Sequence, residues 1–197
     1  MREKGCFLLS GVSAALWTAW NVQDRQVNQL LVDYFSLSEW STIQQGRLQT
    51  VLLYPLCHSS FLHLTANVAT YLTIGRAVER IEGPAILLKL GMMAGPLGFA
   101  VAYSLRNSSS AATTSLQSLR GGGCLSSAVS TYFLAKYWRQ KIDVGPWKVP
   151  GQALALGLLA CESLISCYWA GNRTFDLELG GALAAAYFIF AQRLIIR

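Results

Sequence analysis

Six long apolar runs, separated by polar stretches, dominate the hydrophobic pattern of the chain. They cover residues 6–20, 61–74, 85–105, 124–137, 152–170 and 177–191. Most approach the ~17 to 25 residues that an α-helix needs to cross a bilayer. Solid apolar runs favour helices over a β-barrel, whose strands alternate apolar and polar positions. The pattern therefore predicts an all-α polytopic membrane protein, a bundle of six transmembrane helices.

The amino-acid composition supports the prediction of a membrane protein. Hydrophobic residues make up 53% of the 197 positions, and charged residues only 13%. That balance is too apolar for a soluble domain of this length. Neither internal repeats nor a composition shift divides the chain, so we expect a single membrane domain over residues 1–197.

Basic residues are distributed unequally between the two sides that six helices would define. One side holds both ends of the chain, the second-to-third loop and the fourth-to-fifth loop. It carries eleven basic residues, namely Arg2, Lys4, Arg76, Arg80, Lys89, Lys136, Arg139, Lys141, Lys148, Arg193 and Arg197. The other side carries five, namely Arg25, Arg47, Arg106, Arg120 and Arg173. The positive-inside rule therefore predicts that both ends face the cytoplasm or the mitochondrial matrix.

The net charge of +6 is best explained by this topology and by attraction to anionic lipid headgroups. No basic face interleaved with aromatic residues suits nucleic acid, so no nucleic-acid partner is expected. The five cysteines lack a C-x-x-C spacing, which favours packed thiols over a metal site, and no cofactor is expected. A nucleotide-binding loop is also missing from the sequence, so any motor has to be a partner.

Two connections are long. Residues 21–58 contain Tyr34, Phe35 and Trp40 and are amphipathic enough to lie in the membrane interface. Residues 106–123 are rich in Ser, Thr, Ala and Gly, which predicts a flexible loop. The first apolar run lacks a clear signal-peptidase site, so we expect it to be retained as a helix.

Polar residues inside or beside the apolar runs are the candidates for function. The only two histidines, His58 and His63, precede or begin the second run, and Asn67 follows His63 by one helical turn. Glu162 and Lys89 are ionisable residues near membrane depth, where a charge costs at least ~2.5 kcal/mol. Lys89 can extend toward the interface, whereas Glu162 is expected to line a wet cavity or contact a partner.

Three segments resemble the rhomboid family. Residues 56–67 have the sequence Leu-Cys-His-Ser-Ser-Phe-Leu-His-Leu-Thr-Ala-Asn and are followed by Gly75, Val78 and Glu79. They look like the family's second core helix, which two histidines and an asparagine open. Residues 123–129 look like the glycine-x-serine-glycine segment of the fourth helix, with Ser126 at the nucleophile position. Residues 179–183 look like the glycine-rich sixth helix. The likeness spans about residues 21–195 and is closest to the mitochondrial branch.

The resemblance implies a known chemistry. Rhomboids cut substrate helices inside the membrane with a serine nucleophile and a histidine base, and donors near the serine hold the oxyanion. By this likeness His63 and Asn67 occupy oxyanion positions, and His58 is the other histidine of the motif. The sequence departs from the family at the catalytic step, because Glu178 stands where the sixth-helix histidine is expected. Ser127 and Cys124 also replace two glycines beside Ser126.

A missing base predicts a pseudoprotease, because losing one member of a nucleophile–base unit typically costs on the order of 10⁴-fold in rate. The serines at 126, 127 and 130 can instead serve as small residues that let helices approach. Gly180, Gly181 and Ala185 offer a packing seam of small residues on the sixth helix, which would keep its contact with the fourth.

The resemblance implies three alternative functions. The first is an inactive rhomboid-like protein that binds hydrophobic or transmembrane client polypeptides, as a subunit of an import translocase in the mitochondrial inner membrane. The second is an active intramembrane serine protease that uses Ser126 with Glu178 or a relocated base. The third is quality control in the endoplasmic reticulum, where a glycan at the sequon 107–109 or 172–174 would exclude mitochondria.

Overall fold

The computed structural model describes residues 4–22, 24–108, 121, 123–169 and 175–195. Every apolar run of the sequence is helical where described. The corresponding helices are α1 (Lys4–Trp20), α4 (Phe61–Thr70), α6 (Ala85–Ser108), α7 (Gly123–Tyr137), α8 (Gly151–Trp169) and α9 (Phe175–Ile195). Within the described ranges, two segments are long and apolar enough by themselves to cross a membrane, 85–105 in α6 and 151–168 in α8. The count of six spans stays a prediction.

The second helix extends beyond its apolar run. After α4 the backbone continues through a π-helical turn, η3 (Tyr71–Gly75), into α5 (Arg76–Glu82). The predicted end at residue 74 was therefore too early, because the polar residues of α5 end the apolar run without ending the helix. Gly83 terminates α5 with a positive φ of 92°, which only glycine adopts readily.

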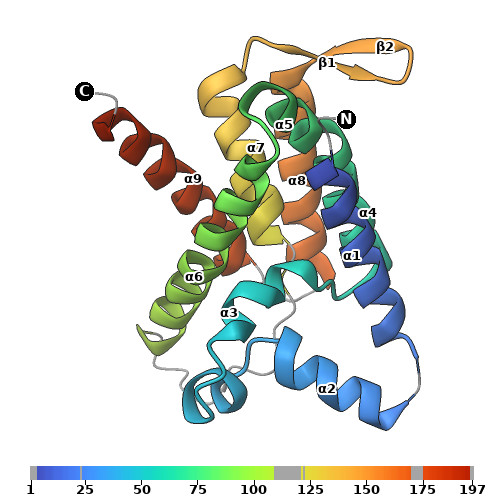
Figure 1. The fold of residues 1–197 in the computed structure, drawn as a ribbon, viewed down its shortest axis with the longest axis vertical. Helices are drawn as coiled ribbons and strands as arrows, with labels where there is room; N and C mark the ends of the chain where they lie inside the picture. The colour runs from blue at the N-terminus through green and yellow to red at the C-terminus, as the bar shows by residue number, and fades with distance from the viewer. Residues whose placement is uncertain (1–3, 23, 109–120, 122, 170–174, 196–197) are drawn as a thin grey trace.

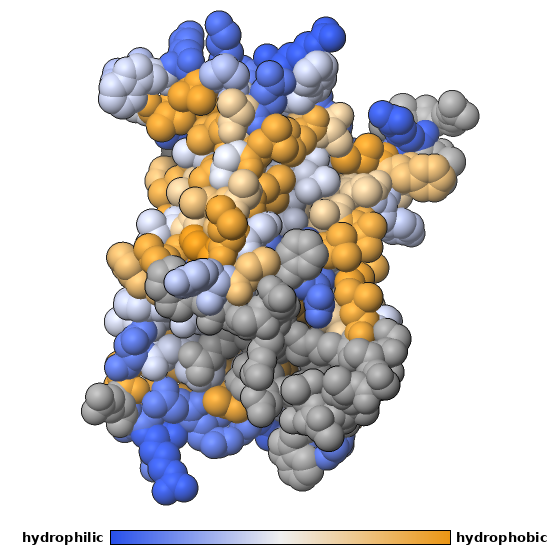
Figure 2. Space-filling model, turned by 180° about the vertical axis from the view of Figure 1, so that it is seen from behind, coloured by the Kyte–Doolittle hydropathy of each residue, from blue (hydrophilic) through white to orange (hydrophobic). Residues whose placement is uncertain are grey.

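The bundle has two polar ends and an apolar middle. The start of α1, the α5–α6 turn and the end of α9 lie at one end, and α2 lies at the other (Figure 1). Figure 2 shows apolar side chains gathered over the middle of one face, with hydrophilic side chains toward both ends. This arrangement fits a chain whose helices alternate in direction across a bilayer.

The connection 21–58 is helical where described. It contains α2 (Arg25–Phe35), η1 (Glu39–Gln44), α3 (Gln49–Leu53) and η2 (Tyr54–Leu56). Asp24 caps α2 by accepting hydrogen bonds from the backbone N–H groups of Gln26 and Val27, at 2.8 and 3.0 Å. Tyr54 is buried and donates to the carbonyl of Gly95 in α6 at 3.1 Å, which ties this connection to the bundle.

The prediction of an all-α fold needs one correction. Residues 141–150 form a two-stranded antiparallel hairpin, β1 (Lys141–Val144) and β2 (Trp147–Pro150), in which Ile142 pairs with Val149. Gly145, with φ of 60°, permits the tight two-residue turn. The hairpin extends at the same end as the start of α1 (Figure 1). Four-residue strands are too short for an alternating pattern to stand out in the sequence.

The helices on either side extend into the predicted loop 106–123, so that loop is shorter than predicted at both ends. Helix α6 continues to Ser108, and α7 begins at Gly123. Residues 109–120 and 122 lie outside the described residues, as do Ser109 of the first sequon and the whole of the second.

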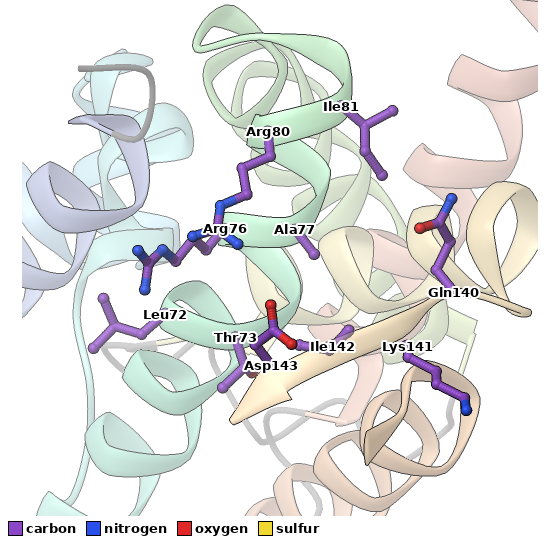
Figure 3. A pocket seen from close by; sticks show the side chains of 10 residues that line it. All are labelled: Leu72, Thr73, Arg76, Ala77, Arg80, Ile81, Gln140, Lys141, Ile142 and Asp143. Carbon is purple, nitrogen blue, oxygen red and sulfur yellow. The ribbon is translucent and has the colours of Figure 1, made fainter. Parts of the chain in front are cut away.

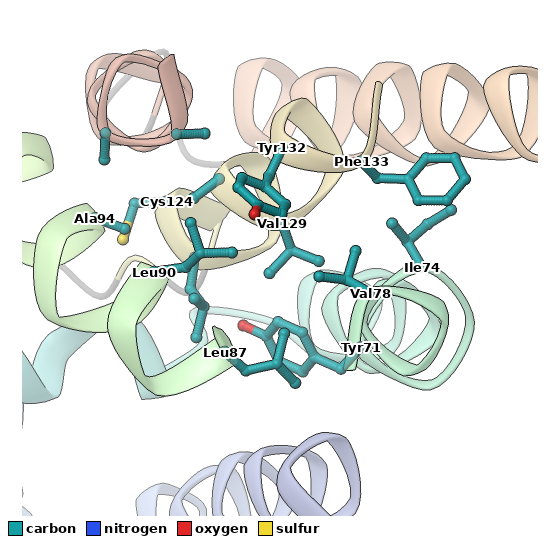
Figure 4. Packing of buried hydrophobic residues seen from close by; sticks show 14 of the residues in the cluster. Tyr71, Ile74, Val78, Leu87, Leu90, Ala94, Cys124, Val129, Tyr132 and Phe133 are labelled. Atoms are coloured by element: carbon teal, nitrogen blue, oxygen red, sulfur yellow. The ribbon is translucent and has the colours of Figure 1, made fainter. Parts of the chain in front are cut away.

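The apolar core lies where the middle helices meet. Tyr71, Val78, Leu90, Val129 and Tyr132 are fully buried and come from α5, α6, α7 and η3. Figure 4 shows these side chains converging between the helices. The core therefore holds α7 at the centre of the bundle, which places Ser126 deep inside the protein.

Glu79 joins two helices through a buried carboxylate. Its two oxygens accept hydrogen bonds from the backbone N–H groups of Gly5 and Cys6, at 2.7 and 2.8 Å. These donors belong to the first turn of α1, whose N–H groups have no partner within the helix and favour a negative charge. Glu79 thus caps α1 from a residue 74 positions away.

Glu82 joins the ends of two other helices. Its carboxylate accepts hydrogen bonds from Lys136 at 2.5 Å and from Tyr137, both in the last turn of α7. Partial burial acts to raise the pKa of Glu82, but these hydrogen bonds outweigh it and hold the pKa below its ordinary value. The link between α5 and α7 therefore persists into acidic solution.

Glycines set the distance between α9 and its neighbours. A Cβ at Gly180 would lie 2.3 Å from the Cα of Gly98 in α6, and one at Gly181 would lie 1.9 Å from the carbonyl oxygen of Cys124 in α7. Neither space can hold a methyl group. Ala185, one turn further along, is fully buried. Small residues thus let α9 approach both helices closely.

We expect Gly181→Ala to destabilise the protein by about 1–3 kcal/mol or more, because α9 has to move away from the α7 backbone. Gly157→Ala in α8 is the matched control, since a Cβ there meets nothing within 4 Å. Unfolding in detergent measures both variants. Equal stability of the two would contradict close packing at Gly181.

Candidate functional site

The first helical turn of α4 positions His63. Ser60 caps this helix, and its hydroxyl accepts a hydrogen bond from the backbone N–H of His63 at 3.1 Å. His63 is only 1% exposed, so its ring points into the protein. Asn67 is fully buried one turn later and donates from Nδ2 to the carbonyl oxygen of His63 at 2.8 Å. The predicted pair therefore shares one inward face of α4.

His58 lies beside His63 and completes a buried polar cluster. The two rings meet edge to face, with their centroids 5.4 Å apart. Among the described residues, neither nitrogen of His58 has a hydrogen-bond partner, nor has Nε2 of His63 or Oδ1 of Asn67. An unpaired buried polar group costs about 1–3 kcal/mol. The polar cluster of His58, His63 and Asn67 is therefore suited to hold ordered water or polar groups of a bound segment.

Ser126 faces a glutamate. Its Oγ lies 2.7 Å from Oε2 of Glu162 in α8, to which it donates, and 3.0 Å from the carbonyl oxygen of Gly123. The second carboxylate oxygen, Oε1, accepts a hydrogen bond from Thr70 of α4 at 2.8 Å. Ser126 is fully buried, and Glu162 is 1% exposed. One carboxylate thus joins α4, α7 and α8.

Glu178 is hydrogen-bonded to α8 and not to Ser126 among the described residues. Its carboxylate accepts hydrogen bonds from Ser163 at 3.1 Å and from Ser166, both in α8. Its backbone carbonyl accepts a hydrogen bond from Ser127 at 2.9 Å. The position that resembles the family's histidine therefore accepts the Ser127 hydrogen bond through its backbone carbonyl.

Helix geometry explains why Ser126 and Ser127 have different partners. Successive residues of an α-helix are turned by about 100°, so adjacent side chains face different neighbours. Ser126 bonds Glu162 of α8, whereas Ser127 bonds the backbone of α9. The hypothesis that Glu178 serves as base for Ser126 does not fit these contacts. Neither histidine bonds Ser126 in the described part of the chain.

The sequence indicated that Glu162 is a functional candidate, but it did not indicate which residue Glu162 contacts. An ionisable residue inside an apolar run predicts a functional contact, but Ser126 is 36 positions away. The spacing of Ser163 and Ser166 was a further signal, because residues three apart share one helix face. That face is where Glu178 of α9 binds.

This arrangement limits the chemistry of the site. A carboxylate at 2.7 Å can accept a proton from a serine, as a general base must. Both oxygens of Glu162 already accept hydrogen bonds, however, which favours a structural link. No group of three or more His, Cys, Asp or Glu side chains in the described ranges is arranged to hold a metal ion.

A family model describes what these helices share with known proteins. The model of the rhomboid domain matches residues 45–193, which include α4, Ser126, Glu162 and Glu178. The chain therefore belongs to the rhomboid family, a family of membrane-embedded proteins that includes serine proteases. No curated protein matches it.

Ser126 and Glu162 should be coupled energetically. In a double-mutant cycle, we expect Ser126→Ala with Glu162→Gln to cost less stability than the two single variants added together. The expected difference is about 0.5–3 kcal/mol, as for directly bonded side chains. Unfolding in detergent provides the four free energies of the cycle.

Ser127→Ala provides the matched control, because Ser127 bonds α9 instead of Glu162. Combined with Glu162→Gln, it should be additive within about 0.5 kcal/mol. Additivity in both cycles would contradict the Ser126–Glu162 hydrogen bond.

Proposed function

We propose that the chain is a proteolytically inactive rhomboid-like protein that binds hydrophobic or transmembrane client segments. The observation that carries this proposal is that the two glutamates of the site accept hydrogen bonds from different serines. Ser126 donates a hydrogen bond to Glu162, which also accepts one from Thr70. The carboxylate of Glu178 accepts hydrogen bonds from Ser163 and Ser166. The catalytic histidine of the family is replaced by Glu178.

Inactivity follows from what a serine nucleophile requires. The base has to take the proton of the serine, and a third group usually orients that base. Glu162 instead joins three helices, so removing its bond to Ser126 would disturb packing inside the bundle. A base lost in this way typically lowers the rate on the order of 10⁴-fold.

Two features support client binding. The polar cluster retains buried nitrogens on His58 and His63 that a client's carbonyl oxygens could contact. Between α6 and α9 lies an apolar groove of about 690 Å³, with Met92, Met93, Leu183 and Phe190 among its lining residues. Flexible methionine side chains adapt to varied apolar partners. A hydrophobic client segment would lie in this α6–α9 groove.

Pro96 removes one backbone hydrogen-bond donor from α6 beside the groove. It lies inside α6 and lines the groove, and it has no N–H to donate to the carbonyl oxygen of Met92. A carbonyl oxygen without a helical partner is costly in hydrocarbon. A client side chain with a hydroxyl group would offset that cost.

We place the protein in the mitochondrial inner membrane, with six spans, as a subunit of a protein import translocase. The likeness of its motifs to the mitochondrial rhomboid branch supports this placement. Basic residues are concentrated at the bundle end that holds the β1–β2 hairpin and the α5–α6 turn, which would face the matrix. Other membrane subunits of the translocase would be its partners.

Ser126→Ala should leave import unchanged in cells that carry no other copy, provided that its abundance matches the wild type. A binding role does not need the hydroxyl, and the small alanine fits the same packed position. Import of a radiolabelled precursor into isolated mitochondria measures the result. Loss of import with normal abundance and assembly would overturn the inactive assignment.

A second candidate function is proteolysis, which the 2.7 Å contact between Ser126 and Glu162 favours specifically. In that case Glu162 would be the relocated base. This function predicts covalent labelling of Ser126 by a fluorophosphonate probe, and loss of labelling in Glu162→Gln. The pseudoprotease predicts no labelling above that of Ser126→Ala.

A further inference from the structure

The β1–β2 hairpin lies at the level where an apolar segment of α8 begins. It joins the end of α7 to the start of α8, and the segment of α8 that is long and apolar enough to cross a membrane starts at Gly151, directly after β2. The carbonyl oxygen of Gln140 accepts a hydrogen bond from the N–H of Gly151 at 2.8 Å, which closes the base of the hairpin. Strand β1 packs against η3, and β2 packs against α8. The base of the hairpin is therefore held in one orientation on the bundle.

The two faces of the hairpin differ in chemistry. Side chains alternate between the faces along each strand, and paired residues of an antiparallel ladder share a face. The register places four apolar side chains on one face, namely Ile142, Val144, Trp147 and Val149. It places the charged side chains on the other face, namely Lys141, Asp143 and Lys148. The hairpin is therefore amphipathic.

The apolar face is turned toward the bundle. Ile142 is 5% exposed and belongs to the core, and Val144 packs against that core. Figure 3 shows β1 beside α5, with Ile142 turned toward the helices and Lys141 pointing away from the arginines of α5. The charged side chains of the other face are all exposed. At the end of a membrane-embedded bundle, a face turned toward the bundle is also turned toward the bilayer.

Trp147 extends the apolar face beyond the part that packs on the bundle. The hairpin runs across the end of the bundle, and its tip projects to the side (Figure 1). Trp147 at this tip is 70% exposed, whereas Val149 on the same strand is half-buried. Trp138, directly after α7, is also exposed. An indole ring has an apolar body and a polar N–H group, so tryptophan is enriched at the level of lipid headgroups.

We infer that the β1–β2 hairpin is an interfacial anchor, which lays its apolar face on the bilayer and inserts the ring of Trp147 among the lipid headgroups. The charged face stays in water. The anchor fixes the depth at which α8 enters the membrane, and α8 carries Glu162 about three turns after Gly151. This surface is independent of client binding and of any chemistry at Ser126.

Addition of a strand from a partner protein fits the hairpin less well than lipid does. Strand β2 is four residues long, carries Lys148 and ends at Pro150, which has no N–H to donate. Short edges that contain lysine and proline disfavour pairing with another strand. The apolar face is turned toward the bundle and not toward water, from which a soluble partner would approach. Lipid is therefore the occupant that matches this face.

The test places a nitroxide spin label at the tip of the full-length protein in nanodiscs of phosphatidylcholine and phosphatidylglycerol. Cys161→Ala and Cys167→Ala first remove the exposed cysteines of α8. Trp147→Cys then provides the labelling site, and power saturation measures collisions with oxygen, which concentrates in lipid, and with a water-soluble nickel chelate. We expect the ratio of oxygen to nickel collisions to be at least about fivefold higher at 147 than at 148, because adjacent strand residues point to opposite faces.

Lys148→Cys in the same background is the matched control, since Lys148 neighbours Trp147 and lies on the charged face. Equal ratios at the two positions, or a higher ratio at 148, would overturn the anchor. Few collisions with either reagent at 147 would overturn it as well, because protein and not lipid would then cover the tip. Thermal unfolding verifies that each labelled variant is folded.

The native ring is measured separately, because Trp147→Cys removes it. Lipids brominated in the upper part of the acyl chain quench tryptophan fluorescence on contact, and iodide quenches it from water. The difference between the wild type and Trp147→Phe isolates the signal of Trp147 among the six tryptophans. We expect this signal to be quenched by the brominated lipid and protected from iodide. Quenching by iodide alone, or by neither reagent, would contradict insertion of the ring.

Discussion

Three glutamate carboxylates buried among apolar helices each need hydrogen-bond donors, because hydrocarbon supplies none. Glu79 finds them in the first turn of α1, Glu162 in hydroxyls of α4 and α7, and Glu178 in hydroxyls of α8. Each carboxylate thus joins its own helix to at least one other. A hydrogen bond to a charged group contributes about 1.5–3 kcal/mol, and an unpaired buried charge costs more. The need to satisfy these groups fixes how the helices meet.

The same requirement explains the proposed loss of chemistry. Ser126 lies deep in the bundle because the core holds α7 at its centre, and there its hydroxyl satisfies Glu162. Ser127 meanwhile bonds the backbone of α9, next to the seam of glycines. A serine that compensates a buried carboxylate has a structural role that a hydrolytic nucleophile lacks. Among the described residues, both ring nitrogens of His58 and Nε2 of His63 lack a hydrogen-bond partner, so they remain available for polar groups that enter the bundle.

Local features of the fold could be predicted from the sequence, whereas contacts between distant segments could not. Apolar runs predicted the positions of six helices because burial follows composition, but the helix through Glu82 continued past its apolar run. The hairpin 141–150 was not predicted, because its strands are too short to show an alternating pattern. Glu162 was singled out as an ionisable residue at depth, yet its partner depended on how α8 packs against α7. The different partners of Ser126 and Ser127 likewise depended on where α8 and α9 pack against α7.

Capture of a membrane-anchored client tests most directly whether the chain binds without cutting. A photoreactive residue at Leu183, in the α6–α9 groove, is compared with one at Leu164, which is 70% exposed on α8. We predict that full-length client is crosslinked at Leu183 in preference to Leu164. Client fragments that appear with the wild type and disappear with Ser126→Ala would contradict the proposed function.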